Sequence, residues 1–261
     1  MEKRIIWRGL LAGLLGGVLA FVFARIFVEP VIDRAIAYED GRGEAEALAT
    51  GAHAHGMEVF TRGIQANIGM GFGVLAFSVA MGALFAVAFA AVYSRFGTTN
   101  PGALAVKMAA AAFVAVYLVP FLKYPANPPS IGHGETISRR TGLYLTMVVA
   151  SLLLAVAAVW LARRLAARLG DWGATLAGIG AYIVVAAVVM VVLPPIAETP
   201  QPLTDANGTI IYPGFSADDL YHFRLYSLGT QVVLWATIGL VFAVLVSRLL
   251  EGRRQEVGVP A

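Results

Sequence analysis

Cysteine is absent from this 261-residue chain, which excludes disulfides, thiolate metal ligands and cysteine nucleophiles. Charged residues are also scarce, at 13%, whereas a soluble domain carries about 25%. The formal net charge of +3 is small and calls for no nucleic-acid partner. Together with a mean hydropathy of +0.76, the deficit of charge indicates a polytopic membrane protein with short loops.

Enzyme signatures are missing as well. The chain contains no H-E-x-x-H, no G-x-S-x-G and no P-loop, and it has no aspartate pair inside an apolar stretch. No segment between apolar stretches exceeds about forty residues, so a soluble catalytic or nucleotide-binding domain has no room. We therefore expect a protein that is not an enzyme and holds no tightly bound cofactor.

Long apolar stretches dominate what remains. Each of six stretches reaches or approaches the ~20 residues with which a helix crosses a bilayer, and helices satisfy their own backbone hydrogen bonds there. The sequence predicts an all-α polytopic membrane protein with about six transmembrane helices, short loops and one longer outer loop, Glu29 to Asn67. We expect a single membrane domain over residues 1–261, with helices near 5–28, 57–95, 103–122, 142–168, 174–193 and 216–250.

The distribution of basic residues predicts the orientation. With the N-terminus inside, the inner side holds eleven Lys and Arg residues and four acids, whereas the outer side holds eight and twelve. Basic residues favour the cytoplasmic side, and Arg163-Arg164 and Arg253-Arg254 stand at segment ends there. We expect a multi-pass protein of the bacterial cytoplasmic (inner) membrane with both termini cytoplasmic.

Small residues at a spacing of four predict close helix packing. Gly9, Gly13 and Gly17 repeat this spacing in the first segment. The second and fifth segments carry shorter versions, Gly69 with Gly73 and Ala174 with Gly178.

Turn and break signals divide the segments. Pro30 is expected to break the exit from the first segment, and Pro120 to kink or end the third. We interpret residues 39–43 as a polar turn and Asn207-Gly208 as a second turn. Residues 216–219 read as a capping box that opens the last helix.

Candidate metal ligands lie in the outer loops. Neutral imidazole and carboxylate suit divalent Co, Ni or Zn where thiolate is missing. His53 and His55, two residues apart in a glycine-flanked segment, can chelate one ion, with Glu58 as an oxygen ligand; the alternative is a solvated loop. Asp218 and His222 can share a helix face, although acids in a first turn also stabilise the helix dipole.

Charged residues near the outer segment ends form a second candidate feature. Charges at membrane depth are costly and usually paired. We interpret the group as an interfacial salt-bridge cluster, with a charged vestibule at a pore mouth as the alternative; its members are Arg25, Glu29, Asp33, Glu39, Lys123, Arg139 and Arg140. Arg139 or Arg140 is expected to pair with an acid of the first outer loop or to lie at a polar helix interface. The polar residues left to line a path are Gln65, Asn67, Tyr117 and Gln231, together with Tyr182.

Several short stretches stand out together: residues 29–32, 38–39, 62–66, 121–129, 139–141, 223–225 and 227–231. With these stretches the chain resembles the CbtA family of predicted cobalt transporter subunits, in its actinobacterial form. The resemblance covers nearly the whole chain. The family is described with about five membrane helices, whereas the apolar stretches here number six.

The resemblance implies a membrane component of a cobalt uptake system that supplies cobalamin biosynthesis, with Co²⁺ as the transported ion. It also implies a partner, the small single-helix, histidine-bearing CbtB subunit, within the lipid bilayer; association into an oligomer is left open. The alternative function is a non-transporting membrane scaffold or accessory subunit of a membrane complex, which the nearly uncharged segment interiors favour.

Overall fold

The structure, a computed structural model, describes residues 2–51, 61–95, 100–129, 131–132 and 136–256. The described chain forms five helices long and apolar enough to cross a membrane: Glu2–Thr50, Arg62–Arg95, Pro101–Lys123, Ile137–Val192 and Ala217–Leu250. The prediction of an all-α polytopic membrane protein is confirmed. The helix count differs from the predicted six because two predicted segments lie in one continuous run.

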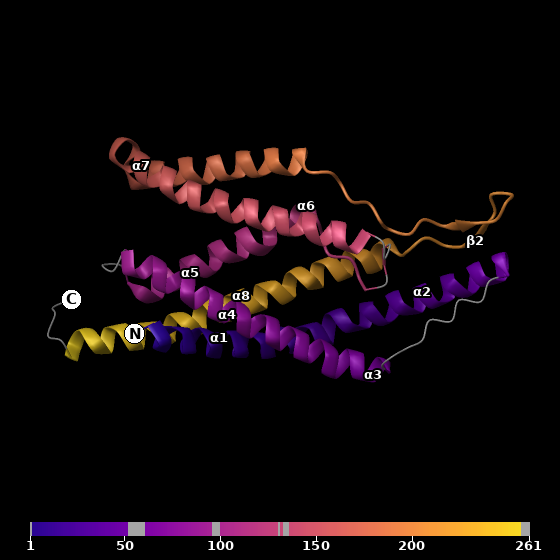
Figure 1. The fold of residues 1–261 in the computed structure, drawn as a ribbon, viewed down its shortest axis with the longest axis horizontal. Helices are drawn as coiled ribbons and strands as arrows, with labels where there is room; N and C mark the ends of the chain where they lie inside the picture. Colours follow the sequence, from indigo (N-terminus) through magenta and orange to yellow (C-terminus); the bar gives the residue numbers. More distant parts are fainter. Residues whose placement is uncertain (1, 52–60, 96–99, 130, 133–135, 257–261) are drawn as a thin grey trace.

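That run is α7, Ile137–Val192, 56 residues long. Gly170 lies inside it with φ 68° and ψ 170°, outside the helical region, and positive φ is a conformation that glycine adopts without steric cost. Figure 1 shows α7 reversing its direction, so α7 is a hairpin of two arms. The arms correspond to the segments predicted near 142–168 and 174–193. Gly178 packs against Ala158 across the hairpin, as the small-residue spacing predicted.

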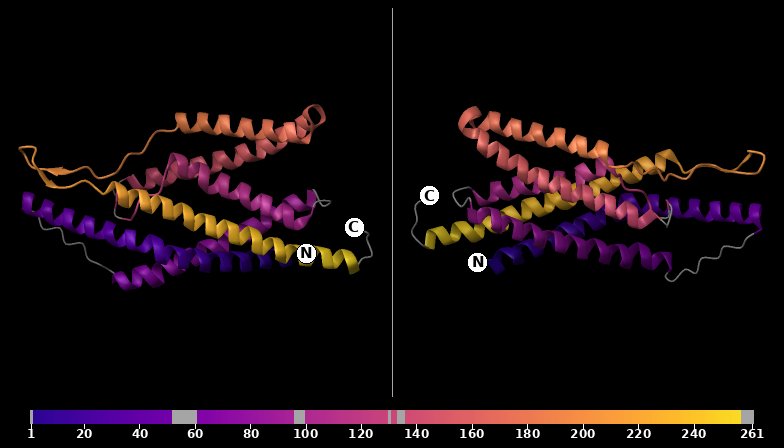
Figure 2. Two further views of the ribbon diagram at one scale, coloured as in Figure 1. Left: turned by 180° about the vertical axis from the view of Figure 1, so that it is seen from behind. Right: turned by 45° about the horizontal axis from the view of Figure 1, so that its top comes forward.

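The main core lies between α1 (Glu2–Phe23), α4 (Met70–Arg95), α5 (Pro101–Ala112) and α8 (Ala217–Glu256). Its centre is aromatic: Phe85, Phe89 and Phe242 stack edge to face, with ring centroids 5.1–5.2 Å apart for the two pairs with Phe242. The α7 hairpin packs beside this core, against the end of the third span (Figure 2).

Glycine lets α1 and α4 approach until their backbones touch. A Cβ at Gly9 would overlap the carbonyl oxygen of Gly82, and one at Gly13 would overlap that of Ser78. The predicted glycine stripe on α1 is therefore used, but its partners are Ser78 and Gly82. Gly69 and Gly73 were the wrong choice: nothing lies within 4 Å of a Cβ at Gly73, because the crossing point falls further along α4.

Pro30 and Pro120 lie inside continuous helices. The expectation that Pro30 breaks the first helix was therefore wrong. π-helical turns precede both prolines: η1 (Ala24–Val28) and η3 (Phe113–Leu118). Glu29 N–H donates to Ala24 O and Val119 N–H to Val114 O, five residues back. The widened turn accommodates the proline ring, which would clash with a carbonyl in a regular helix.

Beyond Pro30 the first helix continues as α2, Glu29–Thr50. The expected outer loop, including the turn at residues 39–43, is therefore helical in its first half. Alanine and glutamate between the glycines favour a helix, and a short hairpin supports it: β1 (Leu203–Thr204) and β2 (Ile210–Tyr212) pair antiparallel. Tyr212 packs on Gly41 and lies 5.4 Å from the Tyr38 ring.

The remaining boundaries follow the predictions more closely. The second span begins with α3 (Arg62–Ile64) and η2 (Gln65–Gly69), while residues 57–60 of the predicted helix lie outside the described residues. The third ends in α6, Val119–Lys123, just after Pro120. Ser216 Oγ accepts a hydrogen bond from Asp219 N at 3.2 Å, as the capping box predicted. The predicted turn at 207–208 is present, with Gly208 at φ 83°.

Figure 1 places the start of α1 and the end of α8 at the same end of the bundle, called here the terminal end. α2, the β-hairpin and the loops before and after α7 lie at the other, distal end. The described chain thus begins and ends at the same end of the bundle; that both termini are cytoplasmic stays a prediction.

A methyl group at the α1–α4 crossing should destabilise the bundle. Gly82→Ala places a Cβ against the backbone of Gly9 and Gly13, and such overpacking costs about 1–3 kcal/mol. The apparent melting temperature in detergent should fall by several degrees. Gly73→Ala is the matched control on the same helix and should melt at or slightly above the wild-type temperature. Equal melting of both variants would contradict the tight crossing.

Candidate functional site

An arginine clamp joins the first two spans at the distal end. Arg62 Nη2 pairs with the Glu29 carboxylate and lies 3.0 Å from Asp33 Oδ1. Nearby, Arg25 Nε donates to Asn67 Oδ1 at 3.2 Å, which links η1 to η2. Glu29 is the buried member, with 2% of its side chain exposed. The clamp (these five residues) holds α2 against the start of the second span.

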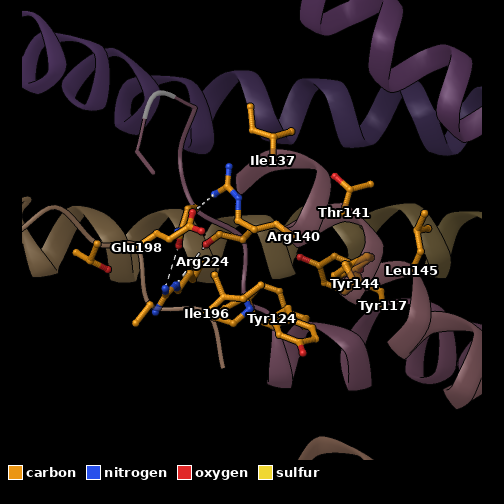
Figure 3. A pocket seen from close by; sticks show the side chains of 16 residues that line it. Tyr117, Tyr124, Ile137, Arg140, Thr141, Tyr144, Leu145, Ile196, Glu198 and Arg224 are labelled. Atoms are coloured by element: carbon orange, nitrogen blue, oxygen red, sulfur yellow. Dashed lines mark hydrogen bonds and ion pairs between the residues drawn. The ribbon is translucent and has the colours of Figure 1, made fainter. Parts of the chain in front are cut away.

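A second polar site is a cavity of about 460 Å³ between α6, the first arm of α7 and α8. Figure 3 shows the side chains of Arg140, Glu198 and Arg224 gathered on one side of this pocket, with Tyr117 and Tyr144 toward the other. The full lining is Tyr117, Phe121, Tyr124, Pro125, Ala126, Asn127, Ile137, Arg140, Thr141, Tyr144, Leu145, Ile196, Ala197, Glu198, Thr199 and Arg224.

One ion pair closes an edge of the pocket. Arg140 Nη1 lies 3.2 Å from Glu198 Oε2, and the Glu198 side chain is only 8% exposed. Gly132, at φ 136°, runs over this pair: a Cβ there would come within 2.8 Å of Arg140 Nη1 and 3.1 Å of Glu198 Oε2. Within the described residues, Glu198 Oε2 accepts no well-aligned hydrogen bond. Its interaction with Arg140 is therefore an electrostatic attraction between close charges and not a hydrogen bond.

Arg224 projects from α8 and is held by neutral acceptors. Its Nε donates to Ala126 O at 3.3 Å and its Nη2 to Asn127 Oδ1 at 3.0 Å. In the described part of the chain, no carboxylate lies within 4.0 Å of the Arg224 guanidinium, unlike those of Arg34, Arg62 and Arg140. Among the described residues, the pocket thus contains a cation whose charge is not balanced.

The end of α6 adds to this positive character. Lys123 Nζ lies 5.7 Å above the Tyr124 ring, and the Tyr124 hydroxyl donates to Pro194 O at 2.8 Å. Burial raises the pKa of Tyr124, and the charge of nearby Arg139 partly offsets that rise. With two arginines against one glutamate, the described residues of the lining carry a formal charge of +1. Such a pocket suits an anion and disfavours a bare divalent cation.

The structure distributes the predicted charged cluster over both sites. Arg25, Glu29 and Asp33 belong to the clamp, in which Arg62 is the central partner. Arg140 pairs with Glu198 of the loop after α7 and not with an acid of the first outer loop, and it lies in the polar pocket between α6, α7 and α8, in line with the predicted alternative of a polar helix interface. Arg139 and Glu39 are exposed.

The predicted metal ligands are not brought together by the described residues. His53, His55 and Glu58 lie outside them. Asp219, beside Asp218, pairs with Arg34 at 2.7 Å, and the His222 ring stacks 5.6 Å from that of Tyr226. No group of three or more His, Asp or Glu side chains with metal-binding geometry occurs in the described part of the chain.

Of the proposed path-lining residues, Tyr117 lines the pocket, whereas Gln65, Asn67 and Gln231 do not. Tyr182 instead hydrogen-bonds Ser151 inside the α7 hairpin, with oxygens 2.7 Å apart.

Sequence reasoning missed Glu198, Arg224 and Arg62 as site residues. Arg224 and Arg62 lie in two of the short stretches that carry the family resemblance. An arginine in the first turns of an apolar helix could have marked each of them as a site residue. Glu198 follows two prolines in a loop, where nothing in the sequence marks it.

The five long apolar helices define a multi-pass membrane protein. Comparison with family models gives the narrower assignment. The chain belongs to the CbtA family, described as a probable cobalt transporter subunit, whose model matches residues 2–247. No curated protein and no solved structure matches the chain.

The Arg140–Glu198 pair should matter most through its buried carboxylate. Arg140→Met leaves Glu198 buried without a cation and should cost about 1–3 kcal/mol of stability. Glu198→Gln alone should cost less, because Arg140 is partly exposed. The double variant should recover part of the Arg140→Met loss in a double-mutant cycle of thermal unfolding. Strict additivity of the two changes would show that the pair makes no energetic contribution.

Proposed function

We propose that this protein is the membrane component of a cobalt (divalent metal) uptake system that works with a small single-helix partner of the CbtB type. Membership in a family described as a probable cobalt transporter subunit carries the proposal. A subunit by description requires a partner. The product supplied to the cell, on this proposal, is cobalt for cobalamin synthesis.

The projecting helix α2 supports a role in cation capture. The continuous helix from Glu2 to Thr50 has 49 residues, roughly 74 Å at ~1.5 Å per residue, while the hydrocarbon layer is about 30 Å thick. Its polar part, α2, carries six carboxylates and two arginines, a formal charge of −4. Negative charge at this position raises the local concentration of divalent cations.

The described residues suggest how the work is divided. They hold no cluster of three potential metal ligands, and the pocket beside α7 is positively charged. The proposed metal ligands are therefore His53, His55 and Glu58, in the segment that follows α2. The alternative is that the partner subunit provides them. A second proposed metal site at the distal end consists of Asp218 and His222.

The alternative is a scaffold or accessory subunit that moves no ion. The apolar interiors of the spans favour it. Accumulation of radiolabelled cobalt by cells with and without this chain, with the partner present in both, separates the two functions. Equal accumulation would support the scaffold.

The histidine pair is tested by the double variant His53→Ala and His55→Ala. Cobalt accumulation should fall several-fold while expression stays at the wild-type level. Because neutral imidazole binds the metal, capture by these residues should also weaken as pH falls below about 6.5. His222→Ala is the control for the second proposed location. Normal accumulation by the double variant would move the metal site there or to the partner.

The charge on α2 is tested separately from the histidines. Four exposed acids, Glu39, Asp40, Glu44 and Glu46, are changed together to Gln or Asn. The initial rate of cobalt uptake at low salt should fall several-fold, and the difference should shrink at about 0.5 M salt, where charges are screened within a few ångströms. Asp171→Asn, exposed at the terminal end, should leave the rate unchanged. A difference independent of salt would refute steering by α2.

A further inference from the structure

We propose that the pocket between α6, α7 and α8 binds a phosphate group, with Arg140 and Arg224 as its cationic partners. The site is separate from the proposed metal capture at α2, and its charge has the opposite sign. The two chemical sources of such a group are the headgroup of an anionic lipid and free inorganic phosphate.

Arg224 supplies the first argument. A guanidinium that is withdrawn from water is normally paired with a carboxylate, yet Arg224 is partly buried and, within the described residues, is held only by the neutral oxygens of Ala126 and Asn127. Two of its five N–H groups are used in these bonds. The remaining donors are available to an anion in the pocket, since arginine is the residue best suited to bind phosphate oxygens in a fork.

Glu198 does not cancel this charge. It lies beside Arg140, with Oε2 3.2 Å from Nη1, and is more than 4.0 Å from any nitrogen of Arg224. It reduces the lining to a charge of +1 and orients the Arg140 guanidinium. One negative charge, that of a phosphodiester, therefore balances the pocket.

The size and polarity of the lining fit a phosphoglycerol headgroup. The cavity volume of about 460 Å³ lies in the range typical of small-molecule sites. Hydroxyl groups of Tyr117, Tyr144 and Thr141 line it together with the two arginines, and hydroxyls can donate to phosphate oxygens or accept from glycerol.

The first arm of α7 points to a lipid as the source. Leu145 lines the pocket and is also 55% exposed. Exposed apolar side chains continue from it toward the terminal end at helical spacing: Val149, Leu152, Leu153 and Val156. They form one face of the helix, along which an acyl chain can lie while its headgroup occupies the pocket. Free phosphate would make no use of this face.

The experiment measures lipid preference on the purified full-length protein by native mass spectrometry. Phosphatidylglycerol and phosphatidylcholine with identical acyl chains compete at equal concentration, with and without inorganic phosphate. A basic residue near a membrane surface contributes about a fivefold preference for anionic lipid. Two arginines should therefore favour phosphatidylglycerol about thirtyfold in the wild type. Arg140→Gln and Arg224→Gln should each reduce that preference about fivefold.

Arg34→Gln is the matched control. Arg34 lies at the distal end, is half exposed, pairs with Asp219 and does not line the pocket, so its loss should leave the preference unchanged. Arg224→Lys keeps the positive charge but loses the paired N–H donors of the guanidinium, and it should retain most of the preference for phosphatidylglycerol. The wild-type competition does not depend on the folding of any variant.

Each outcome decides the proposal. Preferential retention of phosphatidylglycerol that is lost in the arginine variants supports a lipid phosphate. Binding of inorganic phosphate, also lost in those variants, without a lipid preference supports the soluble source. Equal retention of both lipids with no effect of phosphate overturns the proposal, and so does a preference that survives both arginine substitutions.

Discussion

The backbone contact between α1 and α4 is the constraint on which the rest of the structure depends. Gly9 and Gly13 meet Ser78 and Gly82 without intervening side chains. Helix association in a bilayer has no hydrophobic driving force between helices, so close packing of this kind has to supply it. Because α1 continues into α2 and α4 follows α3, the crossing also fixes where Arg62 meets Glu29. The clamp at the distal end is thus positioned by glycines deep in the bundle.

The distal end contains two electrostatic environments of opposite sign. α2 carries a net charge of −4 and extends past the apolar part of its helix, whereas the pocket at the start of α7 is positive. π-helical turns occur in the helices that build both sites: η1 leads into the clamp and η3 contributes Tyr117 to the pocket. Such turns re-aim side chains and are frequent at functional sites. On the two proposals made above, one membrane subunit would attract metal cations at α2 and hold an anionic group in the pocket.

The α7 hairpin joins this framework differently from the other helices. Met147 of the hairpin packs with Val119 and Tyr124 at the end of the third span, rather than in the aromatic core around Phe242. The hairpin's contact with the bundle is strongest at the distal end, where the pocket lies. Occupation of the pocket would therefore bear directly on how the hairpin is held.

The sequence by itself determined the membrane class, the approximate spans, the glycine face of α1, the capping box at Ser216 and the family. Each rests on apolar run length, local spacing or a short motif, which act within a few residues. Tertiary structure decided that Pro30 lies inside a helix, because a π turn and support from the β-hairpin override the local break. It also decided that Arg140 meets Glu198 and that Arg224 faces the pocket. These pairs join residues distant along the chain, and their meeting depends on how the spans cross, which no local pattern records.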